Sequence, residues 1–364
     1  MDSMRPLVSI IVLNYNGMKF LPGCLSTLLN TSYPNFEIIV VDNSSKDGSV
    51  DLIKRSFGSS PRLTVQQNER NFGFAEGNNI GARLANGKYI VFLNVDTETD
   101  SEWLTKLVEV MESDESIGAA QSKLLLFDHS TIDSTGDFID SYGYGFQRGH
   151  GEEDRGQYNK TDEIFSARGA AMIVRKRILM KVGYFDPTFF MLCEDIDLSW
   201  RIRLTGHKVM FVPQSVVYHA GSGIRKAYQS SVQSYYYNNR NILITLIKNY
   251  DLKGLMIYGT VNVLLQLTRS FLSLPFTSNR SCNLSRLKGM IWIIIHFKTI
   301  WRNRLRVQYI LRKVSDKEIK RCVIKKNLAI LEIVWHLLYK NKVRYERFIT
   351  SCLLIRCHRR SHKT

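Results

Sequence analysis

The sequence lacks paired cysteines and long apolar runs. Its six cysteines are scattered, and none form the C-x-x-C pattern of zinc sites. A disulfide framework is not indicated either, and a reducing compartment fits this usage. In the C-terminal part, the longest uncharged stretch covers residues 254–268, and residues 289–297 form another. Both are shorter than the roughly 20 residues that a membrane-spanning helix needs, so a true span is not favoured.

Acidic residues are scarce after residue 225. Residues 226–364 hold 27 Lys and Arg against 5 Asp and Glu, a net charge of +22, whereas residues 1–225 hold 23 against 28, a net charge of −5. The two parts together give the formal net charge of +17. A basic region of this size favours binding to an anionic partner, either lipid headgroups or nucleic acid.

Signals of other protein classes are also missing. The first apolar run, residues 8–13, is too short for the core of a secretory signal peptide, so we expect no leader and assign this run to a buried strand. It leads into Asn-Tyr-Asn-Gly at 14–17 rather than into the G-x-G-x-x-G motif of dinucleotide oxidoreductases. A nucleotidyltransferase would need a glycine-rich loop with a basic residue at the same place, and this sequence has none there.

Residues 1–125 alternate short β-branched runs with segments of helical period. The predicted strands cover 7–14, 36–42, 62–67 and 89–94, and the predicted helices cover 19–30, 47–56, 75–86 and 101–113. Each strand is a continuous apolar run, as expected for a sheet that is covered on both faces. The alternation predicts an α/β fold with a mostly parallel sheet, right-handed crossovers and helices on both faces.

The pattern changes twice after residue 125. Residues 126–165 are rich in Gly, Asp and Tyr and predict a long, mobile loop region. A strand at 170–174, a helix from 194 to 206, and strands at 208–212 and 215–219 then close a first domain, residues 1–225. Residues 226–364 consist of Ile- and Leu-rich segments broken by Lys and Arg, and we expect a second, helical region there.

The apolar segments of residues 226–364 are short and flanked by cations. Such segments are typical of helices that lie in the membrane interface. A membrane span and an ordinary helical subdomain with a solvated basic face are the alternatives. Of the two anionic partners, we expect a membrane surface and no nucleic acid.

Polar residues cluster where the predicted strands end. They are Asn14, Tyr15 and Asn16 after the first strand, Asp42 and Asn43 after the second, and Asn94 and Asp96 after the fourth. Ligands bind at the carboxyl ends of the strands in such sheets, so these residues are candidates for one site. Further along the chain, an aromatic run precedes the acidic residues of 194–197, where a helix is predicted to begin. The combination suggests a metal-bound anion beside a general base.

Five segments, in order along the chain, carry a resemblance to a known family. They are VSIIVLNYN at 8–16, IVVDNSSKDGS at 39–49, NFGFAEGNN at 71–79, FLNVDT at 92–97, and EDIDLSWR with VYH at 194–201 and 217–219. Over residues 8–223 the sequence resembles the family 2 inverting glycosyltransferases of the GT-A fold. It is most similar to the branch that contains rhamnosyltransferases of cell-surface polysaccharide assembly, where a basic helical tail is usual.

The resemblance implies that the strand-end residues bind a nucleotide-sugar donor. Asp42 would accept hydrogen bonds from N–H groups of the base, with residues 14–16 and Asn43 beside it. The alternative for Asp42 is a turn or a helix cap. Asn71 and Gly73 precede a predicted helix whose N-terminus favours phosphate, and a plain loop capped by Asn71 is the alternative there.

Asp96 occupies the last position of the family's Asp-x-Asp metal motif, and Asn94 stands at the first. The resemblance therefore implies that Asp96 holds Mg²⁺ or Mn²⁺ on the donor phosphates. Asn94 removes one charge from the site, which weakens metal binding. His219 is implied as a further metal or diphosphate ligand, and its imidazole suits Mn²⁺ better than Mg²⁺. A structural histidine and a solvated strand-end aspartate are the alternatives.

The resemblance assigns general-base catalysis to Asp195, the second residue of the family's Glu-Asp pair, with Glu194 as the alternative base. Asp195 would take the proton from an acceptor hydroxyl as that oxygen attacks the anomeric carbon. Aromatic neighbours would raise the pKa of Asp195 by desolvation, while the helix N-terminus lowers it. The competing interpretation is an ordinary acidic first turn. Phe189, Phe190 and Trp200 would stack on sugar faces or pack in the core.

The sequence thus predicts an inverting glycosyltransferase that moves rhamnose or another hexose from a UDP-, dTDP- or GDP-sugar to a glycan or a polyprenyl-linked glycan. We expect it in the cytoplasm, peripheral at the inner face of the cell membrane, with insertion of the C-terminal region as an alternative. The competing hypothesis is a non-catalytic protein that binds membrane surfaces or anionic polymers on the same scaffold. The presence of both Asp96 and Asp195 argues against it.

Overall fold

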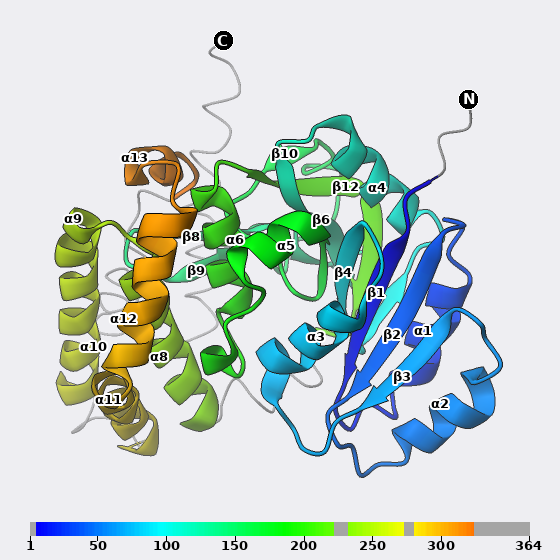
Figure 1. The fold of residues 1–364 in the computed structure, drawn as a ribbon, viewed down its shortest axis with the longest axis horizontal. Helices are drawn as coiled ribbons and strands as arrows, with labels where there is room; N and C mark the ends of the chain where they lie inside the picture. The colour runs from blue at the N-terminus through cyan, green and yellow to red at the C-terminus, as the bar shows by residue number, and fades with distance from the viewer. Residues whose placement is uncertain (1–4, 222–231, 273–279, 324–364) are drawn as a thin grey trace.

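A mixed sheet with helices on both faces lies beside a layer of helices (Figure 1). The computed structural model describes residues 5–221, 232–272 and 280–323. The strands are β1 (Val8–Asn14), β2 (Phe36–Asp42), β3 (Leu63–Gln67), β4 (Tyr89–Asn94), β5 (Thr97–Thr99), β6 (Ile117–Leu126), β7 (Ile132–Ser134), β8 (Asp137–Ile139), β9 (Gly145–Gln147), β10 (Asp162–Glu163), β11 (Ala171–Arg175) and β12 (Lys208–His219).

The helices fall into two groups along the chain. Around the sheet are α1 (Leu21–Leu29), α2 (Ser49–Phe57), α3 (Gly73–Leu84), α4 (Trp103–Ser113), α5 (Lys176–Val182), the 3-10 turn η1 (Pro187–Phe189) and α6 (Glu194–Leu204). The helical layer contains α8 (Val232–Asn249), α9 (Leu252–Gly254), α10 (Thr260–Leu272), α11 (Arg280–Ile295), α12 (Phe297–Leu305) and α13 (Asp316–Ile319). Two π-helical segments, η2 (Leu255–Gly259) and η3 (Arg306–Leu311), and the 3-10 turn η4 (Lys320–Cys322) complete it.

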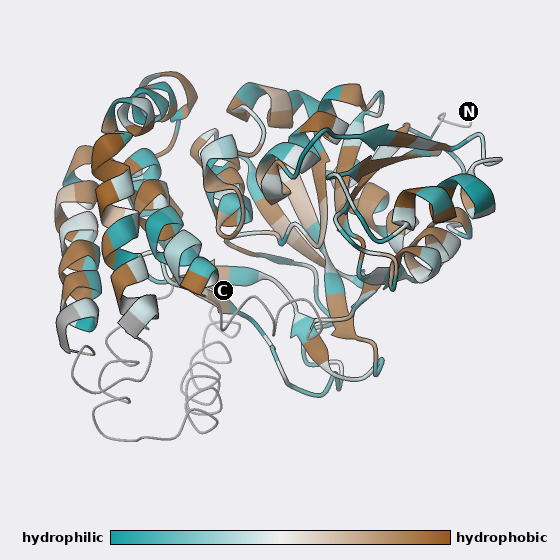
Figure 2. Cartoon of the chain, turned by 90° about the horizontal axis from the view of Figure 1, so that it is seen from below, coloured by the Kyte–Doolittle hydropathy of each residue, from teal (hydrophilic) through white to brown (hydrophobic). Residues whose placement is uncertain are grey.

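The main sheet runs in the order β10-β12-β6-β11-β4-β1-β2-β3. Strands β1 to β4 are parallel to their neighbours within this group, whereas β11 is antiparallel to both β4 and β6. Apolar side chains are buried on both faces of the sheet, in two separate core clusters. Figure 2 shows these apolar strands enclosed between helices, as the continuous apolar runs of the sequence predict. The predicted α/β architecture with a helical C-terminal region is confirmed.

Strand β6 was not predicted, because its sequence is not a continuous apolar run. Gln121, Ser122 and Lys123 lie in its middle and are buried. Each has a distant polar partner, such as Ser215 Oγ at 2.8 Å from Ser122 Oγ and Asp154 Oδ2 at 2.7 Å from Lys123 Nζ. Buried polar groups are tolerated when they are hydrogen-bonded, and such long-range pairing leaves no local sequence signal.

The prediction of a mobile loop over residues 126–165 was wrong. This region contains β7 to β10, and its polar residues Asp133, Asp137 and Asp140 are buried. The two strands predicted at 208–212 and 215–219 form one strand, β12. Its pairing with β6 shifts register between Val212 and Val216, so the Pro213 region is a bulge rather than a break.

The helical layer packs directly against the sheet domain. Ile242 and Leu246 of α8, and Tyr250 directly after it, belong to the same apolar cluster as Trp200 of α6 and the neighbouring face of the sheet. None of the helices in the described residues combines the length and hydropathy that crossing a bilayer requires. Of the predicted basic region, residues 226–231, 273–279 and 324–364 lie outside the described residues. The domain boundary at residue 225 stays a prediction.

Candidate active site

Strands β1, β2 and β4 bring the predicted donor residues to one edge of the sheet. Asn14 pairs with Asp42 in the β1–β2 register, and Leu13 pairs with Asn94 in the β1–β4 register. Because these strands are parallel, their carboxyl ends meet at this edge. Residues that are far apart in the sequence are thereby placed side by side, as their strand-end positions predicted.

Asn14 and Asp42 form a buried pair at this edge. The Asn14 amide nitrogen donates to Asp42 Oδ1 at 2.8 Å and to Ser49 Oγ at 2.9 Å, and Asp42 Oδ2 accepts from the Ser45 amide at 3.0 Å. Asn14 Oδ1 is buried without a hydrogen-bond partner among the described residues. An unpartnered buried acceptor costs free energy, so the hydrogen bonds of the Asn14 amide nitrogen must hold this side chain in place.

Tyr15 and Asn16 follow β1 and lie nearer to solvent. Tyr15 is 42% exposed. Asn16 has a left-handed backbone, φ 52°, and its amide donates to Ser45 Oγ at 2.9 Å. Its side-chain oxygen accepts from the Lys46 amide at 2.8 Å. The turn after β1 is therefore tied to the turn after β2, and the Tyr15 ring is available for a planar ligand.

Asn43, Asn71 and Gly73 join β2 to the start of α3. The Asn43 side-chain nitrogen donates to Asn71 Oδ1 at 3.2 Å and to the Gly73 carbonyl at 3.0 Å. Gly73 has φ +80°, and a Cβ there would lie 2.5 Å from the Phe190 carbonyl oxygen. That carbonyl accepts from the Phe74 amide at 2.6 Å. The first amides of α3 are thus bonded to the segment before α6 and are not left free to bind a phosphate.

Asp96 and His219 face each other because β5 pairs with the end of β12. Thr97 lies opposite His219 in this pairing, and Asp96 Oδ1 is 3.3 Å from His219 Nε2. His219 Nδ1 lies 3.0 Å from Asp133 Oδ2. Burial disfavours the charged imidazole, but the hydrogen bonds to Asp133 and Asp96 and their charges outweigh it and raise the pKa of His219 to about 9.

The Asp96–His219 pair fits a divalent cation. Two adjacent ligands of an octahedral ion at about 2.1 Å lie about 3 Å apart, close to the observed separation. The Asp133 carboxylate on the second ring nitrogen is the partner that metal-bound histidines ordinarily have. Asn94 Nδ2 lies 3.5 Å from His219 Nε2. No group of three or more His, Cys, Asp or Glu in the described residues forms a metal site, so further ligands would come from donor phosphates and water.

Arg168 connects the two acidic halves of the site, and the sequence patterns did not identify it. Its guanidinium lies 3.2 Å from Asp133 Oδ2 and 3.6 Å from Asp137 Oδ2. Burial raises the pKa of Asp137 to about 6, although the nearby Arg168 charge lowers it. The next amide, that of Gly169, donates to Asp195 Oδ2 at 3.3 Å. The only signal for these partners was the Asp-rich composition of residues 126–165.

Glu194 and Asp195 begin α6 with different environments. Glu194 is 6% exposed, and burial together with the Asp195 charge raises its pKa well above the ordinary value. Asp195 is partly exposed, and its Oδ1 accepts from the Ile196 amide at 2.8 Å. Burial raises the pKa of Asp195 as well, but Arg168 and backbone amides oppose this. Asp195 is therefore the more accessible of the two carboxyl groups, and it is the one whose raised pKa is opposed by a nearby cation.

The aromatic residues around this helix start have separate roles. Trp200 is buried between Phe165 and Tyr250, with ring centroids 5.3 and 4.8 Å away, and Phe189 is also buried. Both pack in the core, which resolves the choice between core and sugar contact for them. Phe190 is partly exposed and stacks on Tyr237 at 5.3 Å.

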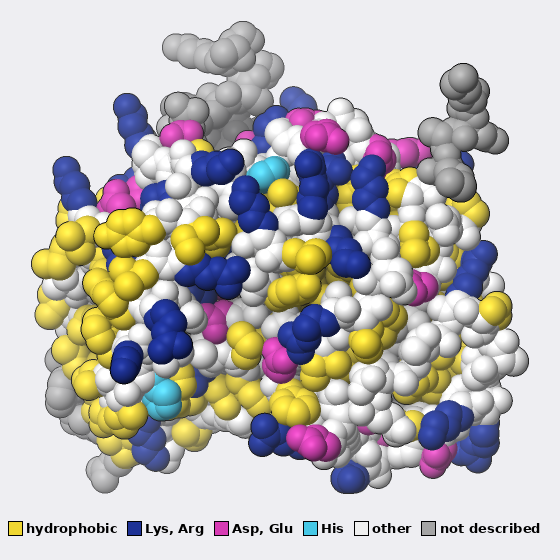
Figure 3. Space-filling model, in the orientation of Figure 1, with side chains coloured by type: hydrophobic (Ala, Val, Ile, Leu, Met, Phe, Trp, Pro, Cys, Tyr) yellow, Lys and Arg dark blue, Asp and Glu magenta, His cyan; other side chains and the backbone are white. Residues whose placement is uncertain are grey.

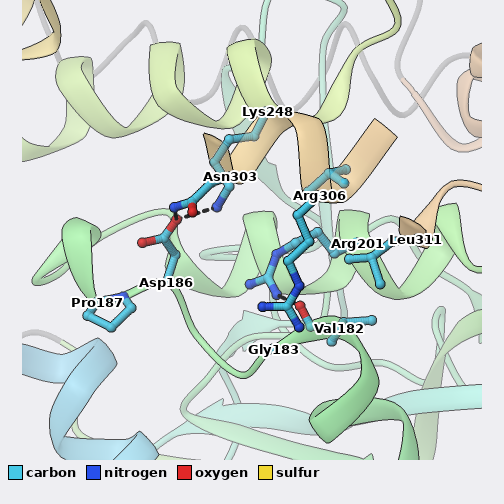
Figure 4. Close-up of a pocket in the computed structure, with 10 residues that line it drawn as sticks. Val182, Gly183, Asp186, Pro187, Arg201, Lys248, Asn303, Arg306 and Leu311 are labelled. Atoms are coloured by element: carbon cyan, nitrogen blue, oxygen red, sulfur yellow. Dashed lines mark hydrogen bonds and ion pairs between the residues drawn. The ribbon is translucent and has the colours of Figure 1, made fainter. Parts of the chain in front are cut away.

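Two cavities lie away from these residues. One, of about 130 Å³, lies beneath α6 and is lined by Asp186, Lys248 and Asn303 (Figure 4). The other lies near Lys88 and Arg175 at the opposite end of the strands. The candidate site is the carboxyl edge of β1, β2 and β4 with the Asp96–His219 pair, joined to Asp195 at the start of α6 through Gly169.

Comparison with known proteins identifies a family profile and distant relatives. Residues 9–183 match the profile described as glycosyl transferase family 2. The O-antigen biosynthesis protein RfbC of Myxococcus xanthus is 30% identical over 234 residues, which cover 61% of this chain and 18% of that protein. The chain spans less than half of the length of the curated relatives it matches.

Two solved structures share the fold. GalNAc-T7 with UDP, GalNAc and Mn²⁺ is 17% identical, with a TM-score of 0.58 over 85% of this chain and 59% of that chain. The mannosyltransferase PcManGT of Pyrobaculum calidifontis with GDP-Man and Mn²⁺ is 16% identical, with a TM-score of 0.52 over 84% of this chain and 86% of that chain. At these identities the likeness concerns the fold, and the predicted GT-A architecture is confirmed.

Proposed function

Since this chain belongs to glycosyl transferase family 2, we propose that it transfers a hexose, such as rhamnose, from a nucleoside diphosphate donor to a hydroxyl of a glycan or lipid-linked glycan. The observation that carries the proposal is the meeting of the Asp42 strand end with the Asp96–His219 pair, to which Arg168 and the Gly169 amide join Asp195. The donor would be a UDP-, dTDP- or GDP-sugar, and its base would lie near Asp42 and Tyr15.

In the proposed reaction Asp195 acts as the general base of a single displacement. Its partly exposed carboxylate takes the proton of an acceptor hydroxyl while that oxygen bonds to the anomeric carbon. The bond from that carbon to the diphosphate breaks on the opposite face, and the nucleoside diphosphate leaves with the electron pair. The anomeric centre is therefore inverted. Arg168 and the Gly169 amide oppose the effect of burial on the pKa of Asp195, and the Gly169 amide orients its carboxylate.

Asp96 and His219 would hold Mg²⁺ or Mn²⁺, which when bound neutralises charge on the leaving diphosphate. Asp133 orients the His219 ring through Nδ1. Asn94 contributes an amide rather than a second carboxylate, so the protein supplies less negative charge than an Asp-x-Asp motif would.

Nucleotide binding should depend on Asp96. Thermal melting is measured with UDP-, dTDP- and GDP-sugars, with and without Mn²⁺, on the wild type, Asp96→Ala and the exposed control Asp51→Ala. A ligand at about 100 times its Kd stabilises the native state by about 2.7 kcal/mol. We expect a Mn²⁺-dependent rise in Tm with one nucleotide series, retained in Asp51→Ala and lost in Asp96→Ala. No shift with any series, with liposomes present or absent, would contradict the donor site.

We also propose that the helical layer binds an anionic membrane surface. Residues 252–315 contain 11 Lys and Arg and no Asp or Glu. Large apolar side chains are exposed on the same helices, among them Met256, Ile291, Ile294, Ile295, Tyr309 and Ile310. Figure 3 shows apolar side chains and cations side by side over this layer. Apolar side chains among cations favour an interface of lipid headgroups over nucleic acid.

Binding to vesicles should need both the lipid charge and the exposed isoleucines. The full chain is sedimented with phosphatidylcholine vesicles, with and without phosphatidylglycerol, at low and high salt. We expect salt-sensitive binding to the anionic vesicles, weakened about tenfold or more by Ile294→Ser with Ile295→Ser. Met180→Ser, at an exposed apolar residue of α5, is the control and should bind as the wild type does. Equal binding to uncharged vesicles would argue against this surface.

A further inference from the structure

The backbone segment before the proposed base is held by a helix of the C-terminal layer. We call residues 188–193 the base loop, because they lead into Asp195. Asn241 of α8 is fully buried, and its side-chain nitrogen faces three carbonyl oxygens of this loop. The distances are 3.0 Å to Phe189, 2.8 Å to Met191 and 2.7 Å to Leu192. One side chain thus binds most of the loop.

Arg240 adds to the same contact. Its guanidinium donates to the Thr188 carbonyl at 2.6 Å and to the Phe189 carbonyl at 3.0 Å. Arg240 Nε donates to Asn241 Oδ1 at 2.9 Å, so the two side chains fix each other. The guanidinium also lies over the Trp292 ring of α11 at 4.3 Å. The base loop is therefore bound by a pair of buried side chains that the helical layer itself holds in place.

The backbone of the base loop needs such support. Phe190, Leu192 and Cys193 have φ values of 61°, 70° and 67°, a region that side-chain-bearing residues rarely adopt. Conformations of this kind persist only where the surroundings fix them. Cys193 is the residue immediately before α6, so its conformation sets the direction in which α6 begins. The direction of the Asp195 side chain follows from it.

Helix α8 makes a second contact two turns further on. Lys248 Nζ lies 2.6 Å from Asp186 Oδ2 and 3.0 Å from Asp197 Oδ2. Figure 4 shows Lys248 and Asn303 directed at Asp186 from the helical layer. Asp186 precedes the base loop and Asp197 follows it, so α8 binds the segment on both sides of the proposed base.

We propose that Asn241 is a positioning residue for the transfer reaction, and that α8 is therefore part of the catalytic centre. This inference rests on the proposed function, in which Asp195 is the base. Asn241 does not contact the donor edge formed by β1, β2 and β4 in any hydrogen bond between described residues. Its loss should therefore impair the chemical step and leave nucleotide binding unchanged.

The test compares Asn241→Leu with Asn239→Leu. Both residues are buried on α8, and the Asn239 side chain donates to the Tyr235 carbonyl of its own helix rather than to the base loop. The rate of nucleoside diphosphate release is measured with the UDP-, dTDP- or GDP-sugar that the wild type hydrolyses fastest, with water as acceptor. We expect Asn241→Leu to lower kcat by about 100-fold with an unchanged nucleotide Kd. Asn239→Leu should stay near the wild type.

A double-variant comparison separates positioning from general damage. If Asn241 acts through Asp195, then adding Asn241→Leu to Asp195→Asn lowers the remaining rate little further. A full additional 100-fold loss in the double variant would overturn the proposal. If Asp195→Asn keeps the wild-type rate, the base assignment of the proposed function is wrong, and hydrogen exchange then decides the role of Asn241.

Hydrogen exchange reports on the base loop without any substrate. We expect the amides of residues 189–196 to exchange faster in Asn241→Leu than in Asn239→Leu, with the strands unchanged. Equal exchange in both variants would overturn the proposal. If Asn241→Leu does not fold, Asn241→Gln, which keeps the amide and moves it by one methylene group, is taken through the same measurements.

Discussion

Asp195→Asn is expected to lower kcat by about 10² to 10⁴-fold, the range that a general base contributes, while nucleotide binding stays unchanged. The amide of asparagine cannot take the proton of the acceptor hydroxyl. The substitution keeps the size of the side chain and can still accept the bond from the Ile196 amide. The fall in kcat therefore reports the missing base. The measurement is steady-state transfer or donor hydrolysis, with nucleotide Kd measured in parallel.

Glu194→Gln is the matched control for that experiment. Glu194 is adjacent, but it is buried, and burial together with the Asp195 charge raises its pKa well above the ordinary value. Glutamine keeps the size of this side chain, and the proposed base is untouched, so kcat should stay close to the wild type. Loss of activity in Glu194→Gln together with an active Asp195→Asn would exchange the two roles.

The pH dependence of kcat/KM follows from the ionisation of the Asp195 carboxyl group. The folded pKa of Asp195 is raised, so the ionised base is lost as the pH falls through a value above the ordinary carboxyl pKa of about 4. In the wild type, kcat/KM should decline on the acid side at that higher pH. In Asp195→Asn this acid limb should disappear, and its persistence would point to another group.

Lys248→Met is expected to destabilise the fold by about 3–5 kcal/mol at neutral pH, because it leaves the buried carboxylate of Asp186 without its cation. Lys248 is 2% exposed and binds both Asp186 and Asp197. Asp197 keeps its ion pair with Arg201 in this variant, whereas Asp186 keeps uncharged donors such as the Asn303 amide. The measurement is urea unfolding at neutral pH. Lys298→Met, at an exposed lysine of α12, is the control and should change stability little.

At acid pH, the difference in unfolding free energy between the wild type and Lys248→Met should become smaller. Burial raises the pKa of Asp186, but the charge and hydrogen bond of Lys248 outweigh it and hold the pKa well below the ordinary range. A lowered folded pKa stabilises the protein above the unfolded pKa of about 4, and this contribution is lost as the pH falls through the folded value. In Lys248→Met the pKa of Asp186 is no longer held low, so Asp186 becomes protonated as the pH falls. Protonation removes its buried, unpaired charge, and the variant then regains part of its unfolding free energy. An unfolding free energy that differs equally at neutral and acid pH would contradict this account.

Strands β1, β2 and β4 were predictable because each contains a continuous apolar run, which is a local signal. β6 was not, because Lys123 and Gln121 become buried only through partners that lie elsewhere in the chain, such as Asp154 and Ser134. For the same reason residues 126–165 were assigned to a loop. Buried carboxylates and solvated ones look alike in a sequence until the cation that binds them is placed.

The donor edge was predictable to the same extent as the strands. Parallel pairing alone places Asn14 beside Asp42, so strand-end positions suffice. The other half of the site depends on contacts between elements of different kinds. Arg168 reaches Asp133 from a loop, and Asn241 reaches the base loop from a helix whose sequence indicated only a basic tail. Local periodicity carries no information about such contacts.

The contact between α8 and the base loop has a consequence for the order of events during synthesis. Asn241 follows Leu192 by 241 − 192 = 49 residues, so the loop leaves the ribosome before the helix that binds it. At about 5–20 residues per second, the interval is about 2–10 s. The strand-end residues Asn14, Asp42 and Asn94 leave the ribosome before Leu192, so a nascent chain exposes them before the base loop has its partner on α8.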